Sequence, residues 1–320
     1  MKFSRRRRRR AATGQWVRLI LCAGALVTLA ACSATVAVTP ASSAAHAVPA
    51  QSAVVKGVST VQRDLTVDGT KRSYLAVRAS SKRTGLPLLV VLHGRGITAR
   101  QESARTGFLA YAQRGLANVV YPMGIGQSWN AEHGCCGLAV KEGAHDTAFV
   151  TSVVGDATRY FGADSRRVYL VGYSNGGRLA FTEVCEHPGL FAAMATYGSV
   201  PSVTCPGRKP ISALISSGTD DPIVRSVHSS PSSAAAVESA VTQWRTQSQC
   251  TASNTTGTGP LKLTTWTGCA GGTEVAQGIY QGLTHYWPVA TKTSAPYTTP
   301  VGPQAAAATV MWNFLSRHTL

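Results

Sequence analysis

A serine framed by glycines is the first feature of this sequence that could perform covalent chemistry. Gly172, Ser174 and Gly176 form a Gly-x-Ser-x-Gly motif. The motif stands between an apolar run, Val168–Val171, and a segment with helical spacing, Asn175–His187. A sharp turn from strand to helix presses main chain against main chain, so glycine on both sides leaves room and exposes the hydroxyl. We therefore predict that Ser174 is a nucleophile at the carboxyl end of a strand.

A serine hydroxyl is a poor nucleophile without a base and an acid that orients the base. In parallel sheets with such a turn, the acid and then the histidine follow the serine along the chain. His285 lies in the loop "GLTHYWP", directly after a strand-like segment, and has the position of the base. Asp220 and Asp221 directly follow the buried run "ISALISSG". Both suit the acid, and the chemistry alone does not choose between them.

The negative charge of a tetrahedral intermediate needs N–H donors, each worth about 3–4 kcal/mol. Asn175, directly after the nucleophile, offers one main-chain donor. The segment "HGRG", His93–Gly96, follows another apolar run and is similar to loops that supply the second donor, here the Arg95 N–H. For His93 we favour a structural role in supporting this loop.

The elements around these residues alternate between strands and helices. A hairpin is predicted at Asp68-Gly69, and residues 251–260 read as turn-rich. Continuous apolar runs predict strands buried on both faces. Predicted strands cover 86–93, 117–122, 166–173, 191–200, 211–218, 261–267 and 274–280, and predicted helices cover 144–161, 175–187, 232–247 and 303–318. This alternation predicts a single α/β domain with a mostly parallel sheet and helices on both faces.

The formal charge of +17 suggests nucleic acid, but its distribution argues against that partner. Residues 1–31 carry eight of the basic side chains and no acid, so 17 − 8 leaves +9 spread over the rest of the chain. No basic block or basic-aromatic stripe follows. We therefore expect no nucleic-acid binding.

The first residues have the pattern of an export signal. A basic start precedes an apolar stretch, residues 19–31, that is too short to span a bilayer. The stretch ends in "LAAC", which resembles the lipobox of bacterial lipoproteins, with Cys32 as the lipidated residue; ordinary secretion is the alternative. Residues 32–57 are rich in Ala, Ser and Pro and read as a tether to a domain over 58–320. We expect an extracellular or cell-surface protein that contacts membrane only through this anchor.

Beyond Cys32 the chain has an even number of cysteines, which in an exported protein predicts disulfides. They are Cys135, Cys136, Cys185, Cys205, Cys250 and Cys269. Their spacing lacks the paired C-x-x-C pattern of zinc sites, and we expect no metal. Cys250 and Cys269 flank a turn-rich stretch and are predicted to pair. Because a bridge between adjacent cysteines is strained, we expect Cys135 and Cys136 to bond outward to Cys185 and Cys205.

Several short stretches, in this order, resemble the secreted esterase family of polyhydroxybutyrate depolymerases and their lipoprotein relatives, with feruloyl and acetylxylan esterases as neighbours. The stretches are "LHGRG", "SWN…GCCG", "HDTAFV", "RRVYLVGYSNGGRLAF", "GTDDPIV", "GC" at residues 268–269, and "GLTHYWP". The resemblance implies an α/β-hydrolase fold with Ser174 as nucleophile, His285 as base and Asp221 as acid. The sequence departs from the family pattern at Ser217, often histidine, at Leu283-Thr284, often glycines, and at Arg95, usually small or cysteine.

The implied activity is hydrolysis of carboxylic esters through an acyl-enzyme, without a cofactor, by a monomer. Depolymerases of solid polyester usually carry a polymer-binding module after the catalytic domain, whereas only one predicted helix follows His285 here. We therefore expect soluble or oligomeric esters as substrates. Alternatives are a feruloyl or acetylxylan esterase, an inactive surface-anchored binding protein, and a peptidase on the same fold.

Four aromatic residues are candidates for an acyl pocket, because two of them flank the predicted catalytic residues. They are Trp129, Tyr173, Tyr286 and Trp287. Membership of the hydrophobic core is the alternative for each of them.

Overall fold

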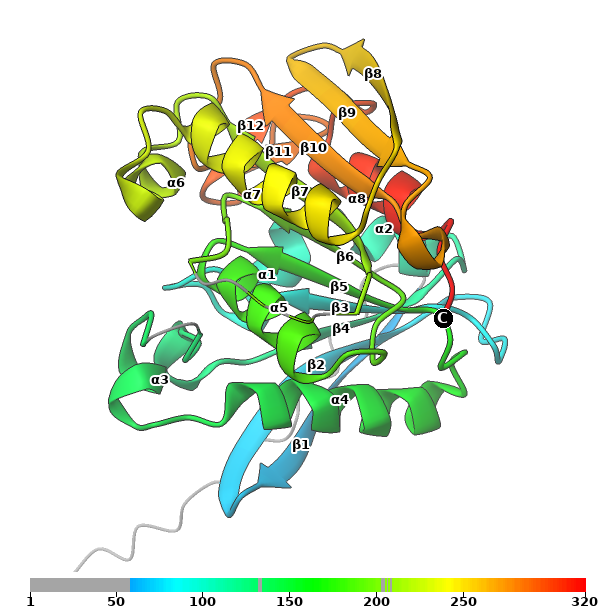
Figure 1. Cartoon of the computed structure of the whole chain (residues 1–320). Helices are drawn as coiled ribbons and strands as arrows, with labels where there is room; N and C mark the ends of the chain where they lie inside the picture. The colour runs from blue at the N-terminus through cyan, green and yellow to red at the C-terminus, as the bar shows by residue number, and fades with distance from the viewer. Residues whose placement is uncertain (1–57, 132–133, 203–204, 206, 208) are drawn as a thin grey trace, which may run out of the picture. The chain divides into compact units, whose positions relative to one another are not determined.

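A ten-stranded sheet organises the residues that the computed structural model describes, which are 58–131, 134–202, 205, 207 and 209–320 (Figure 1). In sheet order the strands are β1 (Ser59–Val67), β2 (Thr70–Arg78), β4 (Asn118–Pro122), β3 (Leu88–Leu92), β5 (Val168–Tyr173), β6 (Ala193–Tyr197), β7 (Ser212–Gly218), β10 (Val275–Tyr280), β9 (Leu261–Thr267) and β8 (Ala252–Thr258). The run from β4 to β10 is parallel, and both ends are antiparallel. A further pair consists of β11 (Trp287–Val289) and β12 (Thr298–Pro300). The predicted mostly parallel α/β sheet is confirmed.

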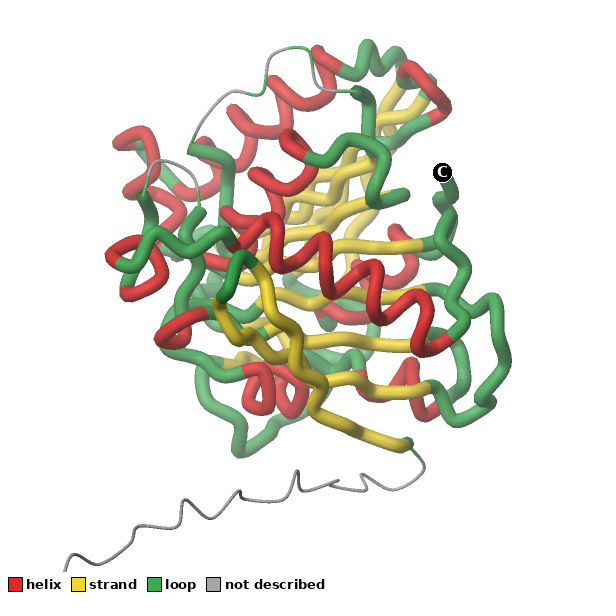
Figure 2. Tube along the Cα trace, turned by 90° about the horizontal axis from the view of Figure 1, so that it is seen from below, coloured by secondary structure: helices red, strands yellow, loops and turns green. Residues whose placement is uncertain are grey.

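Helices cover both faces of this sheet (Figure 2). The helices are α1 (Ala99–Arg105), α2 (Leu109–Gln113), α3 (Leu138–Lys141), α4 (Asp146–Phe161), α5 (Asn175–Glu186), α6 (Pro222–Ser226), α7 (Ser233–Gln247) and α8 (Ala307–Leu315). Successive strand side chains point to opposite faces, so each buried strand feeds two cores. In β3, Leu88 and Val90 pack in the core under α4, α5 and α7, whereas Leu89 and Val91 pack in the core under α1, α2 and α8.

The predicted hairpin is confirmed, with β1 and β2 paired across Asp68 and Gly69, both at positive φ. The strand β8 is a correction, because residues 251–260 were expected to be only turn-rich. All seven residues of β8 are exposed and none packs in a core. The strand therefore does not need the alternation of apolar and polar residues by which a half-buried strand is predicted. Pairing with β9 alone makes it a strand.

The disulfides confirm one prediction and overturn another. Cys250 pairs with Cys269 as expected. The outward pairing of Cys135 and Cys136 was wrong, because these two cysteines are bonded to each other. Cys185 pairs with Cys205, and their Cα atoms lie 5.9 Å apart, a normal separation for a bridge. Because Cys185, Cys205, Cys250 and Cys269 are all bonded in other pairs, Cys135 and Cys136 can bond, among the described cysteines, only to each other.

Among the described residues, no helix is both long and apolar enough to cross a bilayer. The predicted export signal, Cys32 and the tether lie outside the described residues.

Candidate active site

Ser174 occupies a tight turn between β5 and α5, and its backbone has φ 53° and ψ −119°. Such a positive φ is uncommon for a residue other than glycine and marks a constrained turn. A Cβ on Gly172 would lie 2.5 Å from the Gly176 carbonyl oxygen, and one on Gly176 would lie 2.5 Å from the His93 carbonyl oxygen. The glycines are thus required by close main-chain contacts on both sides of the serine, as the sequence suggested.

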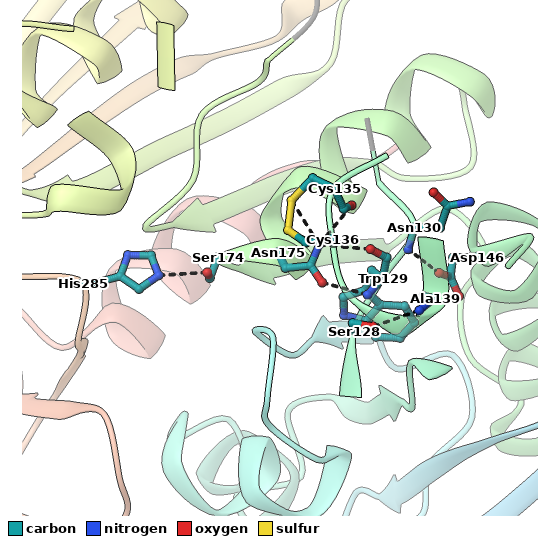
Figure 3. Close-up of a disulfide and its surroundings, with 10 residues drawn as sticks. All are labelled: Ser128, Trp129, Asn130, Cys135, Cys136, Ala139, Asp146, Ser174, Asn175 and His285. Atoms are coloured by element: carbon teal, nitrogen blue, oxygen red, sulfur yellow. Dashed lines mark hydrogen bonds between the residues drawn. A yellow bond between two sulfur atoms is a disulfide. The ribbon is translucent and has the colours of Figure 1, made fainter. Parts of the chain in front are cut away.

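The structure brings the three predicted catalytic side chains together. Ser174 Oγ lies 2.8 Å from His285 Nε2 (Figure 3). His285 Nδ1 lies 2.8 Å from Asp221 Oδ2 on the other side of the ring. The serine is therefore placed to donate its proton to the imidazole while the imidazole donates to the carboxylate.

Asp221, rather than Asp220, is the carboxylate that reaches the histidine. Asp221 is buried at the start of α6 and accepts from the main-chain N–H groups of Ile223 and Val224 at 2.9 and 3.0 Å. Burial raises the pKa of this carboxyl, but its hydrogen bonds, first of all to His285, outweigh that effect and leave the pKa below its usual value. Asp220 is exposed and accepts a hydrogen bond from its neighbour, the Thr219 hydroxyl.

The hydroxyl of Ser217 donates a further hydrogen bond to Asp221 Oδ2 at 2.9 Å. Ser217 stands where the resemblance leads one to expect histidine. Here the serine adds a donor to the carboxylate, which helps to keep it ionised. Sequence reasoning registered the departure but not its role.

Two tyrosines hold the loop that carries His285. The Tyr173 hydroxyl donates to the His285 carbonyl oxygen at 2.9 Å, and the Tyr197 hydroxyl donates to the Thr284 carbonyl oxygen at 3.0 Å. Gly198, at positive φ, leaves room for the ring, since a Cβ there would lie 2.9 Å from His285 Cε1. These contacts fix the imidazole from the sheet side.

Arg95 and Asn175, the predicted sources of oxyanion donors, line the same cleft as Ser174 and His285. His93 supports the Arg95 loop: its Nδ1 lies 2.9 Å from the Gly94 carbonyl oxygen, and its Nε2 accepts the Gly124 N–H at 3.0 Å. Burial lowers the pKa of His93 to about 4, so the ring is neutral at physiological pH. The structure thus gives His93 the structural surroundings that the sequence favoured.

The side chain of Asn175 ties the nucleophile turn to the loop of the adjacent cysteines. Its Oδ1 accepts the Trp129 N–H at 2.7 Å, and its Nδ2 donates to the Trp129 carbonyl oxygen at 3.1 Å. Nδ2 also lies 3.4 Å from the Cys135 carbonyl oxygen, and the Cys135–Cys136 bridge lies next to it (Figure 3). Sequence reasoning had considered only the main chain of Asn175, because a side-chain clamp between distant loops leaves no local pattern.

The four aromatic residues proposed for a pocket lie around the site rather than among the residues that line its cleft. Trp129 is fully buried and donates from Nε1 to the His93 carbonyl oxygen at 2.8 Å. Trp287 is buried in the core and donates to the Thr106 carbonyl oxygen. Tyr173 is buried behind the histidine loop, and Tyr286 is exposed and stacks edge-on with Tyr297.

The cleft itself has a volume of about 280 Å³. Its described lining residues are Arg95, Cys135, Cys136, Ser174, Asn175, Arg178, Gly198, Ser199, Ile223, Val224, Val227 and His285. Among the described residues, no cluster of histidine, cysteine and carboxylate side chains is arranged to hold a metal ion.

The sheet topology, the strained serine turn and the order serine, aspartate, histidine define an α/β-hydrolase. An acetyl xylan esterase from Aspergillus awamori has a similar fold, with a TM-score of 0.53 and 15% identity over 70% of this chain and 93% of that one. The chain belongs to the esterase PHB depolymerase family, whose sequence profile matches residues 70–242.

Two proteins with sequences similar to this chain are also named as esterases. NocK of Nocardia uniformis subsp. tsuyamanensis, a protein named as an esterase, is 31% identical over 181 residues, or 55% of this chain and 52% of its own. A bifunctional acetylxylan esterase/xylanase from Neocallimastix patriciarum is 24% identical over 79% of this chain and 34% of its own. The chain thus spans about half or less of the length of these relatives.

Proposed function

We propose that this protein is a serine carboxylic ester hydrolase that works through an acyl-enzyme. The observation that carries the proposal is the unbroken chain of 2.8 Å contacts from Ser174 Oγ through the His285 ring to Asp221 Oδ2. Membership of the esterase family and the strained serine turn support it.

In the proposed reaction, Ser174 Oγ attacks the ester carbonyl carbon while its proton passes to His285 Nε2. Asp221 stabilises the imidazolium that forms, and the N–H groups of Arg95 and Asn175 bind the negative carbonyl oxygen. His285 then protonates the leaving alcohol, which departs and leaves the acyl group on the serine. Water, deprotonated by the same imidazole, attacks the acyl-enzyme; the bond from the acyl carbon to Ser174 Oγ breaks, His285 returns the proton to Oγ, and the carboxylic acid is released.

We place the substrates among soluble or oligomeric esters of the hydroxyalkanoate type, as in the family to which the chain belongs. Hydrolysis of feruloyl or acetyl groups from xylan is the second candidate, because a relative that aligns over 79% of this chain is named an acetylxylan esterase/xylanase. Rates on hydroxybutyrate oligomers, methyl ferulate and acetylxylan distinguish the two candidates.

The test is hydrolysis of p-nitrophenyl butyrate by the purified protein and by its Ser174→Ala variant. The native protein is expected to hydrolyse the ester, and the variant to lose at least about 10⁴-fold in kcat while keeping its fold and thermal unfolding temperature. Undiminished activity in a folded variant would reject Ser174 as the nucleophile. A folded native protein that hydrolyses no ester of the panel would favour the inactive binding protein instead.

We further propose that residues 1–31 direct export, that Cys32 carries a lipid and that residues 32–57 tether the domain 58–320. The disulfides support an oxidising compartment. In a bacterial host, labelled palmitate is expected to be incorporated into the native protein and not into Cys32→Ala. A native protein without label would exclude a lipid anchor at this position.

A further inference from the structure

Two arginines are among the residues that line the catalytic cleft beside Ser174. Arg95 follows β3, and Arg178 lies on α5, where its N–H donates to the Ser174 carbonyl oxygen at 3.1 Å. One helical turn, about 5.4 Å of rise, therefore separates Arg178 from the nucleophile. Both cations stand close to the point at which an ester is cleaved.

Neither guanidinium has a carboxylate partner within the described part of the chain. Six other described arginines do, and Arg72, for example, forms a buried pair with Asp146 at 2.6 Å. The described lining of the cleft includes no aspartate or glutamate, and the nearby Asp221 is buried and directed at His285. The cleft therefore presents two positive charges without an internal counter-ion.

The charge of the whole domain acts in the same direction. Residues 58–320 carry a formal charge of +8, which is the total of +17 less the eight charges of residues 1–31 and the one charge of Lys56. A cleft with one sign of charge and low-dielectric walls concentrates ligands of the opposite sign. This distribution of formal charge favours an anionic substrate over a neutral one.

The opposite side of the cleft is apolar. Ile223, Val224 and Val227 line it from α6 and the turn that follows α6. The strand order β3-β5-β6-β7 puts the loop of Arg95 on one side of Ser174 and these side chains on the other. A bound ester would thus meet Arg95 on one side of Ser174 and hydrocarbon on the other.

We propose that the natural substrate is an ester with a free carboxylate at one end and a short apolar group at the other, and that Arg95 and Arg178 bind that carboxylate. A short oligomer of a 3-hydroxyalkanoic acid has this chemistry, because each chain ends in a carboxylate. Guanidinium forks match carboxylate geometry and form two parallel hydrogen bonds. An acetyl or feruloyl ester of a neutral polysaccharide offers no such group. The inference rests on the proposed esterase function.

The test compares the linear dimer of 3-hydroxybutyric acid with its primary amide, which has nearly the same shape but no charge. Two partly exposed ion pairs are expected to favour the acid by about threefold each, so kcat/KM for the acid should exceed that for the amide by about 10-fold. The preference should appear in KM and should shrink in 0.5 M salt because of screening. If kcat/KM for the acid is equal to or lower than kcat/KM for the amide, the inference is overturned and the esterase proposal still stands.

Substitutions assign the preference to the two arginines. In Arg178→Gln and in Arg95→Gln, the ratio of acid to amide is expected to fall about threefold, and in the double variant to about one. Arg178→Lys should restore part of it. Arg83→Gln is the matched control, since Arg83 is exposed in the loop before β3, at the opposite end of the strands. A double variant that keeps the native ratio would overturn the inference.

Binding to the Ser174→Ala variant gives a readout that does not need turnover. Calorimetry is expected to give about 10-fold tighter binding of the acid than of the amide, and the difference should vanish when Arg95→Gln and Arg178→Gln are added. If the native protein hydrolyses p-nitrophenyl butyrate but neither compound, the esterase proposal stands and the inferred substrate is wrong. If it hydrolyses none of the three, the esterase proposal fails. Equal binding of acid and amide then overturns the carboxylate site as well, whereas tighter binding of the acid supports that site on its own.

Discussion

Gly176 in the nucleophile turn and Gly257 in the β8–β9 hairpin have very different surroundings. A Cβ on Gly176 would lie 2.5 Å from two main-chain oxygen atoms, whereas a Cβ on Gly257 would lie 3.6 Å from its nearest neighbour, an ordinary contact. Around the site, main chain, rings and carboxylates contact one another directly, and β8 is exposed along its whole length. At the catalytic edge of the sheet, close contacts with neighbouring atoms restrict which residue types fit. At the hairpin, the only requirement is that the two strands can pair.

Beyond the nucleophile itself, the largest effect is expected at the acid of the triad. Asp221→Asn preserves the shape of the side chain but removes the charge and changes the tautomer of His285, so kcat should fall about 10⁴-fold. Asp220→Asn, one residue away and exposed, should change kcat by less than about twofold. Steady-state rates on p-nitrophenyl butyrate measure both. If kcat falls equally in both variants, the aspartates contribute by stabilising the turn that contains them, and not by a hydrogen bond to His285.

The two glycines provide the next largest contrast. Gly176→Ala forces a methyl group against main-chain oxygens and is expected to lower the free energy of unfolding by about 3 kcal/mol and to reduce activity. Gly257→Ala should change that free energy by no more than about 0.5 kcal/mol. Urea denaturation measures both values. A neutral Gly176→Ala would show that the turn tolerates side chains and that glycine is not required there.

Acid should destabilise the site region through His93. Its pKa is about 4 in the folded protein and about 6.5 when unfolded, so stability is fully present above pH 6.5 and is lost as pH falls toward 4. The loss from this one group is at most about 3 kcal/mol. In His93→Gln, the fall in unfolding free energy between pH 6.5 and 4 should be smaller.

The smallest effect belongs to the hairpin. Cys250 and Cys269 close its base, and replacing both with alanine is expected to lower the free energy of unfolding by about 2 kcal/mol. Ester hydrolysis by the folded variant should stay within about twofold of the native rate, because the hairpin lies outside the cleft. A large loss of kcat at full folding would show that the hairpin shapes the site.

Much of the fold and the triad could be predicted because their signals are local. The glycines around Ser174, the aspartates at the end of a buried run and His285 in the loop after another each follow a strand whose apolar sequence is visible. The choice of Asp221 over Asp220 came from resemblance, and the structure supplies its physical basis in burial and hydrogen bonds.

The parts that could not be predicted depend on contacts between distant segments. The Asn175 side chain clamps Trp129, the tyrosines hold the histidine loop and Cys135 bonds to its neighbour because Cys185 has another partner. Tyr173 and Tyr286 flank catalytic residues and were expected in the pocket, yet Tyr173 is buried, Tyr286 is exposed, and neither lines the cleft. Adjacency in sequence placed them near the site without revealing the direction of their side chains.

The most direct test of the catalytic assignment is covalent labelling with a fluorophosphonate followed by peptide mass mapping. A hydroxyl activated by His285 should displace fluoride, so one adduct per chain is expected, on the peptide that contains Ser174, and none in folded His285→Ala. An unlabelled native protein that is folded and still hydrolyses p-nitrophenyl butyrate, or an adduct on another serine, would contradict the assignment.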